Sequence, residues 1–187
     1  MLSRRAFLER GSLALAAMSL HTARAADAQV GPLGKPIGLQ LYTVRDAVAK
    51  DLPGTLRKIA DIGYREVELA GIPPVSAPNL RKILSDCGLT APSMHASMAD
   101  LQSGLAERLD YATTLGTRYL VCSFPWTADS RFRDSPGKAV VSLASGITLD
   151  DWKWNAEQLN KIGEVAAKAG LRCGYHNHNM EFRKYGE

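Results

Sequence analysis

Apolar residues recur at three- and four-residue intervals in four stretches of this chain, the spacing of helices that bury one face. The four stretches are 52–59, 80–87, 101–112 and 152–166. A glycine that suits a left-handed helix end follows each of them: Gly63, Gly88, Gly116 and Gly170. Strand-like segments open the series and then follow each glycine, at 37–44, 64–69, 90–95, 119–123 and 172–178. The pattern predicts five strands that alternate with helices.

Strands that alternate with helices at this spacing predict an α/β fold with a parallel sheet. A dinucleotide-binding fold would have glycines in the turn after the first strand, but 41–46 contains none. The sequence favours a (β/α)8 TIM barrel, which has eight strands in about 250 residues, with only the first five βα units present. Residues 124–150 predict an elaborated loop over one end of the barrel, with a short strand or helical turn at 138–144.

Polar side chains share one side of the predicted strands, because residues two apart in a strand face the same way. The pairs are Gln40 with Tyr42, Glu66 with Glu68, Ser93 with His95, and His176 with His178. The apolar residues between them then pack against the helices. In parallel barrels, polar side chains near the carboxyl ends of the strands carry the chemistry. This convergence predicts a functional site at that end of the sheet.

The densest group of candidate residues stands at the end of the last strand, where His176 and His178 are followed by Glu181. Two imidazoles and a carboxylate at this spacing suit the binding of a divalent cation. They equally suit general acid or base catalysis. Three tryptophans either form an apolar wall over a sugar ring or pack the loop against the fourth helix, namely Trp126, Trp152 and Trp154.

The first 25 residues have the order of charge, apolar run and small residues that is typical of an export signal. Arg4 and Arg5 come first, the apolar run occupies 11–20, and Ala-Arg-Ala at 23–25 suits signal cleavage. The segment resembles a twin-arginine signal, so we expect a periplasmic or secreted protein that interacts with the twin-arginine export machinery. The apolar run has about 10 of the roughly 20 residues needed to span a bilayer, so no stable membrane insertion is expected after cleavage. An amphipathic N-terminal helix on the folded domain is the alternative.

Beyond this signal, at 1–25, the chain divides into a lead-in at 26–36 and a barrel domain at 37–187. Four of the 23 Lys and Arg residues, but only one of the 19 Asp and Glu residues, lie in the signal, so the net charge falls from +4 to +1 without it. Nucleic-acid binding needs a clustered basic excess and is not expected. The three cysteines are odd in number and far apart, so we expect buried free thiols at Cys87, Cys122 and Cys173.

Several strings of residues occur at the predicted strands and before them. They are Gly-Leu-Gln-Leu-Tyr-Thr-Val-Arg-Asp at 38–46, Gly-Tyr-Arg-Glu-Val-Glu-Leu at 63–69, Asn-Lys-Ile-Gly at 160–163, Ala-Lys-Ala-Gly-Leu at 167–171, and Gly-Tyr-His-Asn-His at 174–178 with Glu-Phe at 181–182. In this order and spacing they resemble the sugar phosphate isomerase/epimerase family, which belongs to the xylose isomerase-like TIM barrels. The resemblance runs from about residue 37 to residue 182.

The resemblance implies a divalent metal at the carboxyl end of the barrel, commonly manganese, magnesium, cobalt or zinc, and proton transfer next to a carbonyl. The implied metal ligands are His176 and Glu181. Among the polar residues at the strand ends, the candidate catalytic residues are Glu68, His95 and His178. The implied substrate-binding residues are Gln40, Tyr42, Asn177 and Trp126. In the wider group the fifth strand supplies a metal-binding Glu where this chain has His176, so the division of roles among His176, His178 and Glu181 stays open.

The expected activity is a metal-dependent isomerase or epimerase that acts on a sugar or keto-sugar. The alternatives are a lyase on the same barrel, such as a dehydratase or 3-keto-glycoside eliminase, and a sugar-binding module without catalysis. Apurinic endonucleases share this barrel type, but export and a near-neutral charge argue against DNA repair. Self-association into a homo-oligomer is left open.

The family completes its metal site with an Asp, a His and a Glu from the sixth to eighth strands, and this chain ends just past the fifth. We therefore expect the sequence to be a fragment of a longer barrel that is inactive alone.

Overall fold

The computed structural model describes residues 34–127 and 146–186. The predicted export signal at 1–25 lies outside the described residues, as does the lead-in up to residue 33. The middle of the predicted long loop, 128–145, also lies outside them, and with it the short element expected at 138–144.

Five parallel strands form one sheet in which every strand pairs with its neighbour in sequence. The strands are β1 (Gly38–Gln40), β2 (Glu66–Leu69), β3 (Thr90–Ser97), β4 (Tyr119–Phe124) and β5 (Arg172–Tyr175). Helices connect the strands, so the predicted α/β architecture of alternating strands and helices is confirmed. The register pairs Gln40 with Glu68 and Glu68 with Ser93, which brings polar residues of three strands to one level of the sheet.

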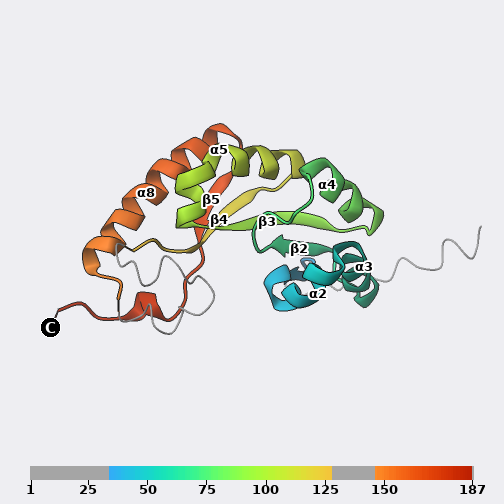
Figure 1. Cartoon of the computed structure of the whole chain (residues 1–187), viewed down its shortest axis with the longest axis horizontal. Coiled ribbons are helices and arrows are strands. Elements are labelled where there is room, and N and C mark those ends of the chain that lie inside the picture. Colours follow the sequence, from blue (N-terminus) through green and yellow to red (C-terminus); the bar gives the residue numbers. More distant parts are fainter. Residues whose placement is uncertain (1–33, 128–145, 187) are drawn as a thin grey trace, which may run out of the picture.

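The helices lie along one face of the sheet. They are α2 (Arg45–Lys50), α3 (Leu52–Ile62), α4 (Ala77–Asp86), α5 (Met98–Leu115) and α8 (Leu149–Lys168). Figure 1 shows α4, α5 and α8 side by side across the strands. The core lies between the two layers, where alternate strand residues such as Val67, Met94 and Leu120 are buried against helix residues such as Leu56 and Leu80. The other face carries the polar residues of the first three strands, which include Gln40, Glu68 and His95.

Local sequence signals set the ends of the two long helices. Ser97 begins α5 and Thr148 begins α8, each in a capping box with the aspartate three residues later. The four predicted terminal glycines all have a positive φ, between 68° and 117°, and are Gly63, Gly88, Gly116 and Gly170. Glycine adopts this left-handed conformation without the steric cost of a Cβ atom, so the helices end where the sequence predicts.

The first predicted strand is shorter than expected. Instead of running over 37–44, the strand ends at Gln40, and the chain enters a 3-10 turn, η1 (Leu41–Val44), followed by α2. The expectation that Tyr42 shares a strand face with Gln40 is therefore wrong. Leu41, Val44 and Val48 all pack on the core, and their three- and four-residue spacing is that of a helix. Leu39 and Leu41 have the two-residue spacing of a strand, whereas Leu41, Val44 and Val48 have that of a helix, which the chain adopts after Gln40.

The fifth strand ends early as well, at Tyr175 rather than at residue 178. The backbone N–H of His176 still donates to the carbonyl of Cys122 at 2.9 Å, so His176 stays level with β4. A second 3-10 turn, η2 (Met180–Phe182), follows.

The three cysteines are free, as predicted, and Cys122 is fully buried while Cys87 and Cys173 are partly buried. Burial raises the pKa of the Cys122 thiol to about 12, so this thiol stays protonated. Within the described ranges, no helix has both the length and the apolar character needed to cross a membrane.

Candidate functional site

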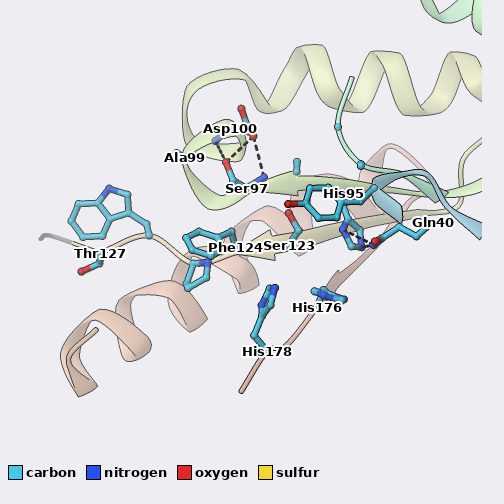
Figure 2. A pocket seen from close by; sticks show the side chains of 16 residues that line it. Gln40, His95, Ser97, Ala99, Asp100, Ser123, Phe124, Thr127, His176 and His178 are labelled. Atoms are coloured by element: carbon cyan, nitrogen blue, oxygen red, sulfur yellow. Dashed lines mark hydrogen bonds between the residues drawn. The ribbon is translucent and has the colours of Figure 1, made fainter. Parts of the chain in front are cut away.

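A pocket of about 730 Å³ opens at the carboxyl ends of the strands. Its walls come from β1, β3, the start of α5, the exit of β4 and the segment after β5 (Figure 2). Residues that represent these five walls are Gln40, His95, Asp100, Phe124, His176 and His178. Ligand sites in parallel α/β folds form at this end of the sheet because the loops that follow the strands meet there.

Glu68 is the centre of a hydrogen-bond network at the base of this pocket. Its Oε1 lies 2.9 Å from Nε2 of His95 and accepts a hydrogen bond from Nε2 of Gln40 at 2.9 Å. Its Oε2 accepts a 2.5 Å hydrogen bond from the hydroxyl of Ser93. The amide nitrogen of Gln40 also lies 3.2 Å from Nδ1 of His95. Three neighbouring strands thus fix one carboxylate and one imidazole against each other.

These hydrogen bonds keep Glu68 ionised. The pKa of the Glu68 carboxyl falls from 4.5 to about 2, chiefly because His95 donates to the carboxylate. Burial alone would raise this pKa. The three hydrogen bonds from His95, Ser93 and Gln40 together outweigh the effect of burial. Glu68 is therefore a fixed negative charge beneath the pocket at any pH near neutral.

His176 lies next to this network with its ring in the pocket. The ring centroid is 5.0 Å from that of His95 and 4.8 Å from that of His178. Desolvation lowers the pKa of His176, and repulsion by the two neighbouring imidazoles lowers it further. Glu68 and Glu181 act in the opposite direction. His176 is therefore mainly neutral near pH 7, with a lone pair that can accept a proton.

Glu181 holds the turn after β5 instead of facing the pocket. Its Oε1 accepts a hydrogen bond from the hydroxyl of Tyr175 at 2.6 Å, and its Oε2 accepts one from the backbone N–H of His178 at 2.7 Å. Burial raises the pKa of the Tyr175 hydroxyl, and the Glu181 carboxylate raises it further. Nδ1 of His178 is buried and has no hydrogen-bond partner in the described part of the chain.

An aromatic segment forms the far wall of the pocket, where β4 leads into residues 125–127. The indole of Trp126 lies against that of Trp154, with ring centroids 4.7 Å apart. Asn155, a buried amide on α8, hydrogen-bonds to both backbone polar groups of Trp126. Trp126 is therefore anchored to α8 through its ring and its backbone.

The structure brings most of the predicted site residues together. Gln40, Tyr42, His95, Trp126, His176 and His178 line the pocket. Glu68 lies beneath them through its contacts with His95 and Gln40. Two predicted residues are not among those that line it: Glu181 is committed to the turn, and Asn177 is exposed, with its amide 3.4 Å from the carbonyl of His178.

Sequence reasoning missed Asp100 and Asn155. Asp100 lines the pocket, and its only signal in the sequence is a Ser-x-x-Asp helix start at 97–100. Asn155 is a polar residue that interrupts the buried stripe of α8, which is the one feature that marks it.

The described residues do not make up a metal centre. Among 34–127 and 146–186, no group of three or more His, Cys, Asp or Glu side chains is placed to hold a metal ion. His176 and His178 offer two imidazoles, which is fewer than the four ligands of zinc or the six of magnesium. A divalent metal stays a prediction, and the chemistry proposed for this site uses the chain's own side chains.

Similarity to solved structures bears on the fold. Two sugar phosphate isomerase/epimerase structures from Parabacteroides distasonis match the chain with TM-scores of 0.57 and 0.58, at 23% and 24% sequence identity. The matches cover 86% and 79% of this chain, but 55% and 56% of those proteins. The chain has the α/β fold of the first five βα units of a TIM barrel. Its five βα units span about half the length of the structures that it matches.

A xylose isomerase domain-containing protein from Salmonella typhimurium has the same fold, with a TM-score of 0.52 at 12% identity. That match covers 74% of this chain and 47% of that protein. No protein-family model and no curated protein matches the sequence. At such low identity the likeness establishes the fold, and any function has to be argued from the site.

Proposed function

We propose that the whole protein is a sugar isomerase or epimerase that moves a proton to and from a carbon next to a carbonyl group. Proteins of that description share the fold. The observation that carries the proposal is the imidazole of His176, which lies beside the Glu68–His95 pair at the carboxyl ends of the strands. A neutral base next to a fixed carboxylate is suited to taking a proton from carbon.

His176 is the proton acceptor in this proposal. It lines the pocket, it is mainly neutral near pH 7, and no hydrogen bond occupies its ring within the described residues. A general base needs this combination of access and an available lone pair, and such a base contributes roughly 10²- to 10⁴-fold to a rate.

Glu68 and His95 support the base. Both ring nitrogens of His95 have polar neighbours, Glu68 at Nε2 and Gln40 at Nδ1, so its ring is held in one orientation. The negative charge of Glu68 raises the pKa of His176, which favours the imidazolium that forms when His176 takes the proton. Glu68 therefore supports His176 by its negative charge, and His95 supports it by its fixed position.

The reaction needs no oxidant or reductant. The C–H bond next to the carbonyl breaks, its electron pair forms the C=C bond of an enediolate, and the electron pair of the C=O π bond moves onto the carbonyl oxygen, which becomes an oxyanion. His176 holds the abstracted proton. Return of the proton to the former carbonyl carbon, while the proton of the adjacent hydroxyl group passes to the oxyanion, gives the isomer. Return of a proton to the other face of the original carbon regenerates the carbonyl group and gives the epimer. His178, whose ring is next to that of His176, is placed to take part in the second transfer.

The test is hydrogen exchange at carbon. The protein expressed from its own gene is incubated in D2O with a panel of D-fructose, D-psicose, D-tagatose and methyl 3-keto-glucoside, and deuterium at the carbon next to the carbonyl is followed by NMR. We expect exchange with at least one sugar, and a loss of about 10²-fold or more in His176→Gln. Asn177→Ala, an exposed neighbour outside the pocket wall, is the matched control and should exchange at the original rate.

Two results would reject the proposal. If no sugar exchanges its proton for deuterium, the proposed isomerase or epimerase activity is rejected. If His176→Gln exchanges at the original rate, the assignment of His176 as the base is rejected. Formation of an unsaturated product with loss of a substituent would instead assign the protein as a lyase that shares the same first step.

A further inference from the structure

The exit of β4 presents an aromatic side chain that is held from α8. Asn155, which is 2% exposed, accepts a hydrogen bond from the backbone N–H of Trp126 at 2.8 Å. Its amide nitrogen donates to the backbone oxygen of Trp126 at 2.7 Å and to that of Asp151 at 2.7 Å. Both backbone polar groups of Trp126 are therefore fixed to one buried side chain.

The ring of Trp126 is fixed as well. Trp154, next to Asn155 on α8, lies against it with ring centroids 4.7 Å apart and planes inclined by 42°. Aromatic rings at this separation attract each other beyond the effect of the area that they bury. A pocket wall that is already rigid loses little conformational entropy when a ligand binds. Trp126 thus has the properties of a preorganised binding surface.

The aromatic wall and the histidines line one pocket of about 730 Å³. The backbone N–H of His176 bonds to the carbonyl of Cys122, which places His176 level with that residue. Trp126 comes four residues later, and an extended chain advances about 3.3 Å per residue, so Trp126 lies at most about 13 Å farther along. In Figure 2, Thr127 lies at the opposite end of the view from Gln40, with Phe124 between them. The pocket therefore extends beyond its reacting end.

The geometry points to a second subsite at Trp126, which binds the apolar face of a ring attached to the reacting sugar. This inference rests on the proposed function, because the reacting sugar is placed at His176. A pyranose presents C–H groups on one face, and such a face packs on the part of the half-buried Trp126 that lines the pocket, as other apolar surfaces do. The substrate class is then a glycoside or disaccharide rather than a single sugar.

The experiment compares two ligands that differ by one ring. Binding of D-fructose and of isomaltulose, which is fructose with an attached glucose, is measured by calorimetry on the protein expressed from its own gene. We expect isomaltulose to bind roughly tenfold more tightly. In Trp126→Ala this preference should fall below about twofold, with D-fructose affinity unchanged, and Trp126→Phe should retain most of it.

Asn155 is tested as a positioning residue. Asn155→Asp keeps an acceptor for the N–H of Trp126 but loses the donor to its carbonyl. We expect the ratio of isomaltulose affinity to D-fructose affinity to fall about threefold in this variant, with the affinity for D-fructose unchanged. Trp152→Phe is the matched control, since Trp152 lies on the same helix but donates to the hydroxyl of Tyr185 instead of lining the pocket.

The outcomes separate this inference from the proposed function. Equal affinity for the two sugars, or a Trp126→Ala variant that keeps the preference, overturns the second subsite and leaves the proposed function standing. Failure of the unaltered protein to bind either sugar overturns the subsite, whereas the proposed function is decided separately by the exchange assay with the whole sugar panel. If Trp126→Ala lowers the affinity for both sugars equally, Trp126 contacts the reacting sugar itself, and the second subsite is overturned.

Discussion

Among the residues of the site, Glu68 links the stability of the fold to the chemistry of the pocket. It receives hydrogen bonds from β1 and β3 while it stands on β2, so its charge joins three strands. Removing a partly buried charged partner costs more than removing an exposed one, because the remaining polar groups lose a hydrogen-bond partner that water does not fully replace. A substitution of Glu68 should therefore change both the free energy of unfolding and its dependence on pH.

The first prediction concerns acid. The pKa of Glu68 is lowered from 4.5 to about 2 in the fold, so its contribution is complete above pH 4.5 and is lost as the pH falls toward 2. The free energy of unfolding of the unaltered protein should exceed that of Glu68→Gln at pH 6, and this excess should shrink by about 2 kcal/mol at pH 3. Urea unfolding at the two pH values measures it.

His95→Gln serves as the second variant in this test. It removes the main cause of the lowered pKa, so the loss of stability between pH 6 and pH 3 should be smaller in it than in the unaltered protein. An excess of the same size at both pH values would show that the Glu68 carboxyl is not stabilised as an anion.

The second prediction concerns Glu181. Because its two oxygens bind the hydroxyl of Tyr175 and the N–H of His178, Glu181→Gln should destabilise the fold by about 1.5 to 3 kcal/mol and shift the ring signals of His178 in NMR. Tyr175→Phe removes one of the two bonds and should cost about half as much. Asn177→Ala, at an exposed position, should change stability by less than about 0.5 kcal/mol. If Glu181→Gln leaves the stability of the fold unchanged, Glu181 does not hold the turn after β5.

Single residues also show what the sequence could and could not predict of the site. Alternation along β2 and β3 was enough to place Glu68 and His95 on one face, because a strand fixes side-chain direction. Glu181 and Asn155 could not be placed in this way. Their roles depend on hydrogen bonds to backbone groups 3 and 29 residues away, which no periodicity records.

At the scale of elements, periodicity predicted the four main helices and the glycines that end them, and these are confirmed. It failed where two periods overlapped. Leu39 and Leu41 fit a strand, but Leu41, Val44 and Val48 also fit a helix, and the chain turns into η1 and α2 after Gln40. A three-residue strand gives too short a pattern to decide between the two.

The third prediction belongs to α5. Ser97 caps this helix through a reciprocal pair of hydrogen bonds with Asp100, so Ser97→Ala should cost about 1 kcal/mol of stability. Ser103 lies inside the same helix and bonds only to preceding carbonyls, so Ser103→Ala should cost little or nothing. Thermal and urea unfolding of both variants measures the difference. Equal losses would show that the cap does not hold the helix end.

At the scale of the whole molecule, the arrangement of the sheet explains why the site exists. Helices cover one face, so the polar residues of the other face and of the strand ends are brought together by five separate βα units (Figure 1). The sequence predicted this architecture because each unit repeats the same order of strand, helix and glycine. It left open whether Trp126 forms an apolar wall or packs the loop against the fourth helix, because the contact between Trp126 and α8 forms only when the fourth and fifth units pack.

The most direct test of the account is a double-mutant cycle on carbon–deuterium exchange, with His176→Gln, Glu68→Gln and the two together. His176 lies on the segment after β5 and Glu68 on β2, so only the assembled sheet makes them one unit. We predict losses of about 10³-fold for His176→Gln and about tenfold for Glu68→Gln. The double variant should lose no more than His176→Gln alone, because Glu68 acts only through that base. Losses that multiply would contradict the account, since they would mean that the two residues serve separate steps.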